Sequence, residues 1–243
     1  MTLTNKTILI TGGTSGIGLE IVKKLSPYNQ IICISKEGKL PEELLQGKFP
    51  VELHHANLEH KNSLESVFDL ILRQHEKLDV LINNAAIQHT PKFLDESFNY
   101  DAIETEVSIN FTAICHLIYL SIPLLQASKK GIILNINSGL AVKPKANSAV
   151  YCATKSALNS LSTSLKYQFE NSNIEIKQVC LPLVDTAMTA GRGKGKLSSN
   201  SVANKIINCI NSKRFNHDIG KVKLLRIINY FMPALAAQIM KRG

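Results

Sequence analysis

Short apolar runs alternate with helix-length segments along most of this chain. The runs are almost continuously apolar, which is typical of strands in a sheet that is covered on both faces. Regular alternation of such strands with helical segments indicates a parallel, doubly wound α/β sheet. The expected strands are residues 7–11, 31–34, 51–54, 80–82, 132–136 and 174–181, and the expected helices are about 17–26, 61–75, 100–128 and 151–170.

Length and composition favour a single globular domain. The chain has 243 residues, of which 44% are hydrophobic, enough for one sizeable core. Five scattered cysteines without a C-x-x-C pair favour a reduced, cytoplasmic protein, and we expect no metal site. Because the sequence shows neither a signal-peptide layout nor 18 consecutive apolar residues, we also expect no membrane-spanning helix.

The net charge of +9 is concentrated near the C-terminus. Residues 187–243 hold eleven Lys and Arg and one acidic residue, whereas residues 1–186 hold seventeen Lys and Arg and eighteen acidic residues. We therefore divide the chain into a domain at 1–220 and a basic amphipathic tail at 221–243, whose helix Pro233 should kink or divide. The tail has few aromatic residues and matches no nucleic-acid module, so we expect no nucleic-acid partner.

The tail pattern leaves two interpretations open. Lys223, Arg226 and Asn229 fall opposite the apolar face of its helical wheel. Such a helix fits an anionic membrane surface, and it fits equally well a place over a substrate pocket or against a partner subunit. The apolar face consists of Leu224, Leu225, Ile228, Phe231, Met232, Leu235 and Ile239.

A glycine-rich segment, T11-G-G-T-S-G-I-G18, joins the first expected strand to the first expected helix. This edge of an open α/β sheet is where ligands bind. The N–H groups of a helix N-terminus suit a pyrophosphate, and glycines let the backbone approach it closely. The segment therefore predicts a nucleotide site rather than a plain connecting turn.

Three further motifs follow in order along the chain. N83-N-A-A86 and Ser138 each end an expected strand, and Y151-C-A-T-K155 opens an expected helix. Tyr151 and Lys155 share one helical face, where an ammonium beside the phenol would lower the tyrosine pKa from about 10. Such a tyrosine can exchange a proton with a substrate, and a nearby Ser138 hydroxyl can hold the reacting oxygen.

With these motifs in this order, the chain resembles a classical short-chain dehydrogenase/reductase over roughly residues 5–220. Its P182-L-V-D-T186 segment resembles a less characterised bacterial branch of that family. The resemblance implies a Rossmann-like fold and an oxidoreductase that interconverts a carbonyl and an alcohol with a nicotinamide cofactor. Three positions depart from the family pattern: Ala86 and Leu183 replace glycines, and Asn57 replaces an aspartate.

The resemblance also implies roles for individual residues. Tyr151 would be the general acid or base, and Lys155 would lower its pKa and hold the nicotinamide ribose. Ser138 would polarise the substrate carbonyl, and Asn110 would hold a water in the proton relay. The implied cofactor site comprises Gly12, Thr14, Ser15, Gly16, Ile17, Gly18, Ser35, Lys36, Asn57, Leu58, Asn84, Ala85, Ala86, Tyr151, Lys155, Pro182, Leu183, Val184 and Thr186.

The end of the second expected strand bears on the choice of cofactor. NAD enzymes usually place an acidic residue there for the ribose 2′-hydroxyl, whereas this chain has Ser35 and Lys36. A hydroxyl and an ammonium suit a 2′-phosphate, so we expect NADP(H). Glu37 is the counter-indication, and NAD(H) stays the alternative cofactor.

The substrate is the least constrained part of the prediction. Residues 187–200 form the expected substrate loop, where Arg192, Lys194 and Lys196 either steer an anionic substrate or are simply solvated. An apolar substrate is the other expectation, and Gln88 and His89 are candidates for the pocket mouth. Family resemblance implies a homodimer or homotetramer built through residues 100–128 and 151–170. The competing functional hypotheses are a nucleotide-binding regulatory protein and a membrane-peripheral protein.

Overall fold

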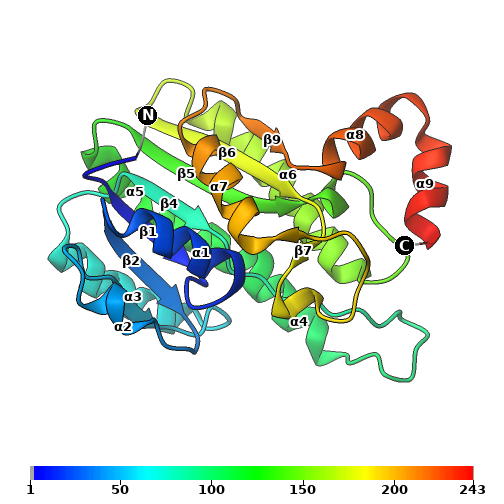
Figure 1. Cartoon of the computed structure of the whole chain (residues 1–243), viewed down its shortest axis with the longest axis horizontal. Coiled ribbons are helices and arrows are strands. Elements are labelled where there is room, and N and C mark those ends of the chain that lie inside the picture. Colours follow the sequence, from blue (N-terminus) through cyan, green and yellow to red (C-terminus); the bar gives the residue numbers. More distant parts are fainter. Residues whose placement is uncertain (1–2, 243) are drawn as a thin grey trace.

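A seven-stranded parallel sheet forms the centre of the computed structural model, which describes residues 3–242 (Figure 1). Its strand order, β3-β2-β1-β4-β5-β6-β9, reverses direction beside β1, as in a doubly wound nucleotide-binding fold. The predicted Rossmann-like fold is therefore confirmed. The strands are β1 Thr7–Thr11, β2 Gln30–Ser35, β3 Glu52–His55, β4 Val80–Asn83, β5 Gly131–Ser138, β6 Ile174–Leu181 and β9 Asn216–Asp218.

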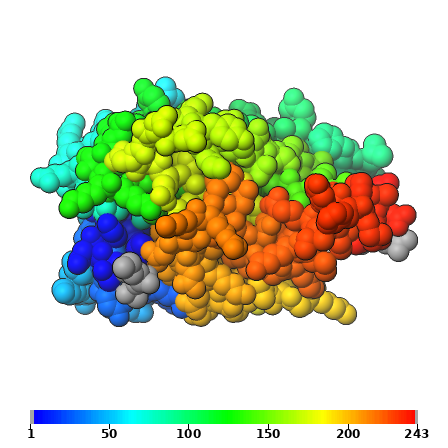
Figure 2. All heavy atoms as spheres, turned by 90° about the horizontal axis from the view of Figure 1, so that it is seen from above, coloured from blue at the N-terminus to red at the C-terminus, as the bar shows by residue number. Residues whose placement is uncertain are grey.

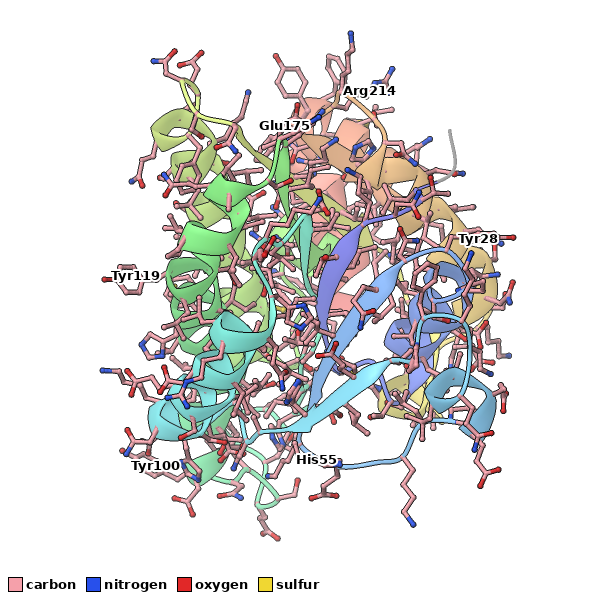
Figure 3. The ribbon with its side chains drawn as sticks, turned by 90° about the vertical axis from the view of Figure 1, so that its left-hand side faces the viewer. Tyr28, His55, Tyr100, Tyr119, Glu175 and Arg214 are labelled. Atoms are coloured by element: carbon pink, nitrogen blue, oxygen red, sulfur yellow. The ribbon has the colours of Figure 1, made fainter. Side chains whose placement is uncertain are left out.

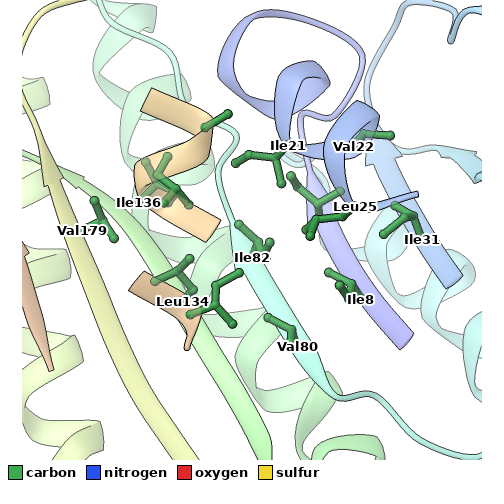
Figure 4. Close-up of a cluster of buried hydrophobic side chains, with 14 of the residues drawn as sticks. Ile8, Ile21, Val22, Leu25, Ile31, Val80, Ile82, Leu134, Ile136 and Val179 are labelled. Atoms are coloured by element: carbon green, nitrogen blue, oxygen red, sulfur yellow. The ribbon is translucent and has the colours of Figure 1, made fainter. Parts of the chain in front are cut away.

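Helices cover both faces of the sheet and create two apolar layers. The layer under α1 and α7 contains Ile21 and Val22, which pack on Ile8 and Ile82 of the sheet (Figure 4). The opposite layer contains Phe68 of α3, which is fully buried. The helices are α1 Gly16–Leu25, α2 Glu42–Leu45, α3 Lys61–Gln74, α4 Asp101–Val107, α5 Ala113–Ala127, α6 Ala149–Gln168, α7 Ser199–Ile210, α8 Lys221–Phe231 and α9 Pro233–Arg242.

The expected helix at 100–128 is not regular throughout. A π-helical turn at Ser108–Thr112 separates α4 from α5 and contains the fully buried Asn110. The stretch Asp101–Ala127 is long and apolar enough to cross a membrane by length and composition alone. In this fold, however, the side chains of Ile114 and Leu117 belong to the core, while Tyr119 points away from the molecule (Figure 3).

Two regular elements near the C-terminal end were missing from the sequence prediction. Helix α7 begins at Ser199, within the last residues of the expected loop, and β9 adds a seventh strand beside β6. Strand β9 has only three residues, too few to show a strand pattern in the sequence. The expected loop is itself partly regular, because β8 Leu197–Ser198 pairs with β7 Val184–Asp185.

The tail forms two helices that project at one end of the molecule (Figures 1 and 2). Pro233 divides them as expected, because α8 ends at Phe231 and α9 begins at the proline. Arg226 and Asn229, which were expected opposite the apolar face of the tail, hold α8 to the domain. Arg226 forms an ion pair with Asp218, and Asn229 donates a hydrogen bond to the carbonyl of Val142 at 3.4 Å.

Candidate active site

One large cavity of about 820 Å³ lies at the carboxyl ends of the parallel strands. It extends from the glycine-rich turn after β1, past Ser138 and Tyr151, to the tail helices. All the predicted cofactor residues except Thr14 line this cavity. Segments that are far apart in the sequence therefore meet in one place, because parallel strands end at the same sheet edge.

The glycine-rich turn requires its glycines at defined positions. Gly12 and Gly16 have φ angles of +68° and +53°, in the left-handed region that favours glycine. At Gly18 a Cβ atom would lie 2.0 Å from the carbonyl oxygen of Gly12. The side chain of Asn84 braces the same turn by donating hydrogen bonds to the carbonyls of Thr11 and Gly12, at 2.9 and 3.2 Å.

The N-terminus of α1 has the chemistry of an anion site. Its N-cap residue, Ser15, makes no side-chain capping bond, and the first turn holds no acidic residue. The N–H groups at the start of a helix lack intrahelical partners and carry the positive end of the dipole. Ser15, Gly16 and Ile17 all line the cavity, so the residues present fit a pyrophosphate group.

The predicted catalytic side chains meet near the middle of the cavity. Tyr151 is 9% exposed, and its phenol is hydrogen-bonded to Ser138. The Nζ atom of Lys155 lies 5.7 Å from the centroid of the Tyr151 ring and donates a 3.0 Å hydrogen bond to the carbonyl of Ile136. Helix α6 begins at Ala149, after Ser148 in a left-handed conformation with φ 57°.

Burial controls the pKa values of this group. It raises the pKa of Tyr151 to about 12, although the hydrogen bond with Ser138 acts in the opposite direction. Burial also lowers the pKa of Lys155 to about 8. The expected lowering of the Tyr151 pKa is therefore wrong for this structure, because removal of the phenol from water outweighs the Ser138 hydrogen bond and the Arg192 charge, which lower it.

Asn110 does not line the cavity. Its carboxamide forms a pair of hydrogen bonds with the backbone of Ile87, with 2.9 Å to the N–H and 2.8 Å to the carbonyl. It also donates to the hydroxyl of Thr154 on α6 at 3.4 Å. Asn110 therefore fixes the segment after β4 against the helix that carries Tyr151.

The end of β2 presents a serine and a lysine to the cavity. The Ser35 hydroxyl lies 2.8 Å from that of Thr14 and donates to the carbonyl of Glu37 at 2.9 Å. Thr14 thus braces this turn and is not among the residues that line the cavity, and its cofactor contact stays a prediction. The side chain of Lys36 is 54% exposed and lies 3.3 Å from a carboxylate oxygen of Glu59.

Two segments complete the expected cofactor side. Asn57 accepts a hydrogen bond from the N–H of Glu59 at 3.2 Å, which leaves its side-chain NH₂ as the remaining donor. Pro182 and Leu183 line the cavity after β6, and Leu183 is 37% exposed. A Cβ atom at Gly193 would lie 2.3 Å from the Leu183 side chain, so Leu183 packs directly against the 187–200 segment.

Two of the three basic residues in the 187–200 segment are held in place. Arg192 donates a 2.9 Å hydrogen bond to the side-chain oxygen of Gln88 and a second bond to the carbonyl of Met188. Lys196 donates to the carbonyl of Thr189 at 2.6 Å and lies 3.6 Å from Asp185. Lys194 is exposed.

Comparison with known proteins identifies the family. The short chain dehydrogenase family model matches residues 6–196. The chain belongs to the short-chain dehydrogenase family. It is therefore an oxidoreductase of the kind that uses a nicotinamide cofactor.

This dehydrogenase is similar in sequence to two relatives and in fold to one solved structure. It is 36% identical to an uncharacterized oxidoreductase, DltE, of Bacillus subtilis (strain 168), covering 77% of this chain and 75% of that protein. It is 29% identical to an NADP-dependent 3-hydroxy acid dehydrogenase of Schizosaccharomyces pombe, covering 79% and 77%. A short chain dehydrogenase from Burkholderia cenocepacia, solved with NADP, has the same fold at 17% identity, with TM-score 0.88 and coverage of 99% and 100%.

The tail closes the far end of the cavity in this dehydrogenase, which agrees with one of the interpretations of the tail that the sequence left open. Helix α8 packs over Gly139, the residue after Ser138, where an added Cβ atom would lie 3.0 Å from Val222. The loop before α6 contacts α9, because the N–H of Ala146 donates to the carbonyl of Met240 at 3.4 Å. The lining residues that were not predicted include Leu140, Lys145, Met188, Val222, Leu225, Ile228 and Met240.

Proposed function

We propose that this dehydrogenase reduces a carbonyl compound with NADPH, and oxidises the corresponding alcohol in the reverse direction. One observation carries the proposal. The hydrogen-bonded pair Ser138 and Tyr151, with Lys155 beside it, lies in the same cavity as the glycine-rich turn. A cofactor held at the turn and a substrate held at Tyr151 would therefore share one enclosed space.

When bound, the nicotinamide supplies the hydride in reduction and accepts it in oxidation. In this proposal the Ser138 hydroxyl donates to the carbonyl oxygen of the substrate and orients it towards Tyr151. The Tyr151 hydroxyl gives its proton to that oxygen as the hydride reaches the carbonyl carbon, which yields the alcohol. Lys155 stabilises the phenolate that remains and holds the ribose hydroxyls.

The pKa of Tyr151 leaves the phenol in the protonated form that the reduction step requires. With a pKa of about 12, the phenol carries its proton at neutral pH and is ready to act as an acid. In the oxidation direction the same group would have to act as a base, which requires the phenolate. A nearby positive charge would then be needed to lower the pKa, and Lys155 is the residue placed to supply it.

We assign Asn110 a positioning role: it holds α6 in place and, as the family resemblance implies, also holds a water of the proton relay. Its two hydrogen bonds to Ile87 and its bond to Thr154 hold α6 against the segment after β4. Its place in a π-helical turn brings the carboxamide to Ile87. A water at that turn would extend a proton path from Lys155 to solvent.

The end of β2 supports NADP(H) over NAD(H). Ser35 and Lys36 line the cavity, whereas Glu37 is exposed and does not line it. The acidic residue that would bind a 2′-hydroxyl is thus turned away, while the ammonium of Lys36 is placed to meet a 2′-phosphate. The S. pombe relative is also named as NADP-dependent.

Replacement of the proposed acid tests this function. Tyr151→Phe should reduce NADPH turnover with a panel of ketones and aldehydes by at least about 1,000-fold, because proton transfer to the substrate oxygen is lost. NADPH affinity should stay within about twofold of wild type, since the phenyl ring still fills the same space. Tyr119→Phe, at an exposed position on α5, is the matched control. Residual activity above about a tenth of wild type would contradict the role of Tyr151.

A regulatory protein that binds the nucleotide without chemistry is the alternative function. It predicts the same NADPH binding but no turnover by the wild-type chain with any member of the panel. The site residues favour the enzyme, because Ser138, Tyr151 and Lys155 remain together and are positioned by buried contacts. A binding protein has no need for that group.

The outer side of the tail supports a peripheral membrane contact as a second candidate function. Ile227, Tyr230, Phe231 and Met232 are all more than half exposed, although α8 also lines the cavity. We propose that these side chains contact an anionic lipid surface. Full-length protein should sediment with anionic vesicles, and the double variant Tyr230→Ser, Phe231→Ser should not. Equal sedimentation of both proteins would exclude this role.

We also propose a cytoplasmic homodimer or homotetramer built through α4–α5 and α6. Tyr119 on α5 and Tyr167 on α6 are 75% and 67% exposed, large apolar surfaces that an oligomer would bury. Light scattering should give at least twice the 26.8 kDa chain mass, and Tyr119→Glu should shift the mass towards the monomer. A wild-type monomer would contradict this assembly.

A further inference from the structure

Two cations without an acidic partner in the described residues lie at the substrate end of the cavity, Lys145 in its lining and Arg192 beside it. Lys145, in the loop before α6, lines the cavity and is half-buried. Arg192 is anchored to Gln88 and Met188, two residues that also line the cavity. Within residues 3–242, neither cation lies within 4 Å of a carboxylate oxygen. Burying a charge without an opposite partner costs free energy, which the anionic group of a ligand would offset at these two positions.

The two charges act on each other and on the catalytic tyrosine. Burial and the Arg192 charge both lower the pKa of Lys145, and the same Arg192 charge lowers that of Tyr151. Lys145 and Tyr151 line the same cavity, and so does Gln88, to which Arg192 is bonded, so the three groups surround one space. The nearest acid that acts on Tyr151 is Glu106, which is 2% exposed and accepts a hydrogen bond from the N–H of His89. It neutralises neither cation directly.

The orientation of Arg192 is built into the fold. Gln88 accepts from Arg192 and donates to the hydroxyl of Ser148 at 3.1 Å, in the turn that begins α6. This chain of bonds connects the segment after β6, the segment after β4 and the catalytic helix. By contrast, Lys194 on the same segment is exposed, and Lys196 already has Asp185 as its partner.

Most of the other side chains at this cavity end are apolar, although the exposed Lys221 of α8 also lines it. Leu140, Met188, Val222, Leu225 and Ile228 line it beside the catalytic pair. A ligand with one anionic group and an apolar body would match both parts of the wall. The anionic group would offset the two cations, and the apolar body would lie against α8.

We propose that Lys145 and Arg192 form an anion subsite that selects an amphiphilic substrate with a carboxylate or phosphate group close to its carbonyl. This inference rests on the proposed function, because it deepens the account of the same cavity. Lys145 contacts the anionic group, and Arg192 strengthens the field and fixes the mouth of the subsite. The subsite lies at the other end of the cavity from the glycine-rich turn.

Calorimetric titration of the protein with NADP⁺, using octanoate and octan-1-ol as matched probes, tests the subsite without turnover. Octanoate should bind at least about tenfold more tightly than octan-1-ol, because only the carboxylate gains charge-assisted hydrogen bonds. Lys145→Gln and Arg192→Gln should each weaken octanoate at least about fivefold and leave octan-1-ol within about twofold. Lys145→Arg and the control Lys194→Gln should both retain the preference for octanoate.

Several outcomes would overturn the proposal. Equal binding of the two probes by the wild-type protein would do so without any variant. Unchanged octanoate binding by Lys145→Gln would also do so, provided that this variant binds NADP⁺ as wild type does.

A preference for octyl phosphate over octanoate would support the subsite and identify phosphate as the anion. Failure of NADP⁺ to bind, with octanoate still preferred, would instead contradict the proposed function and leave the subsite standing.

Discussion

Arg226 of α8 forms a two-bond ion pair with Asp218 of β9, with distances of 2.6 Å from Nε to Oδ2 and 2.8 Å from Nη2 to Oδ1. The carboxylate raises the pKa of the guanidinium still further, so Arg226 keeps its charge. Because α8 packs on Gly139 beside Ser138, this ion pair determines how the tail covers the catalytic residues.

Loss of the ion pair should loosen the tail without unfolding the domain. Arg226→Met should speed amide hydrogen exchange in α8 about fivefold, which corresponds to about 1 kcal/mol for a partly exposed pair. The KM for an apolar substrate should rise because the cavity wall is less ordered. Lys223→Met, exposed on the same helix, is the matched control. Unchanged exchange in α8 would show that apolar contacts alone hold the tail.

The Lys155 pKa predicts how activity depends on pH. Burial lowers this pKa from 10.5 to about 8, so the free enzyme loses the lysine charge as the pH rises through 8. The charged form is the one that stabilises a phenolate and attracts an anionic cofactor. We therefore expect kcat/KM for NADPH, which reports on the free enzyme, to fall above about pH 8. A flat profile from pH 6 to about 10 would contradict this role for Lys155.

Lys36 should control the preference for the 2′-phosphate. Lys36→Glu replaces the cation at the end of β2 by an anion and should weaken NADPH binding at least about tenfold, or about 1.4 kcal/mol. NADH binding should change less than about twofold, because NADH lacks the 2′-phosphate. Lys39→Glu makes the same charge change at an exposed position outside the cavity lining. Equal losses for both cofactors would remove Lys36 from the specificity determinants.

Asp79, at the opposite edge of the sheet from the site, should make the free energy of unfolding depend on pH in the acid range. It is 1% exposed and accepts hydrogen bonds from the N–H of Thr7 at 3.0 Å and the Ser128 hydroxyl at 2.7 Å. Burial raises its pKa, but these bonds and Lys6 outweigh burial and lower it below 3.8. Asp79 then binds a proton more readily in the unfolded chain than in the folded one. The stabilisation that ionised Asp79 contributes to the fold is therefore complete above about pH 5 and is lost as the pH falls through the folded-state pKa.

Denaturant unfolding at several pH values checks this prediction. Asp79→Asn should cost about 2 kcal/mol of unfolding free energy at pH 7, because one acceptor becomes a donor beside Thr7 and Ser128. The variant and wild type should converge in stability as the pH is lowered towards about 3. A constant difference across that range would show that the charge of Asp79 is not what stabilises this edge.

The parts of the fold that depend on local pattern were predictable from the sequence. Apolar runs located six strands, and the spacing of Tyr151 and Lys155 placed both side chains on one face of α6. Positions that depend on distant contacts were not predictable. Lys145 gains its place through the closure of α9 over its loop, and Thr14 turns to Ser35 rather than to the cavity. The predicted lowering of the Tyr151 pKa was wrong for the same reason, since the burial of this side chain comes from the whole fold.

The tail illustrates the limit of the helical wheel. The wheel placed Arg226 opposite the apolar residues and did not indicate a partner for it. In the structure Asp218 lies next to Arg226, so the same face is anchored to the sheet. Apolar residues at neighbouring positions also separate: Ile228 lines the cavity, while Phe231 is 73% exposed. A periodic pattern identifies a helix, but its neighbours decide what each face does.

Fluorescence titration of the purified protein with NADPH and with NADH tests the central claim most directly. The account predicts that NADPH binds at least about tenfold more tightly than NADH, because Lys36 meets the 2′-phosphate and Glu37 lies outside the cavity. Tighter binding of NADH, or binding of neither nucleotide, would contradict the account.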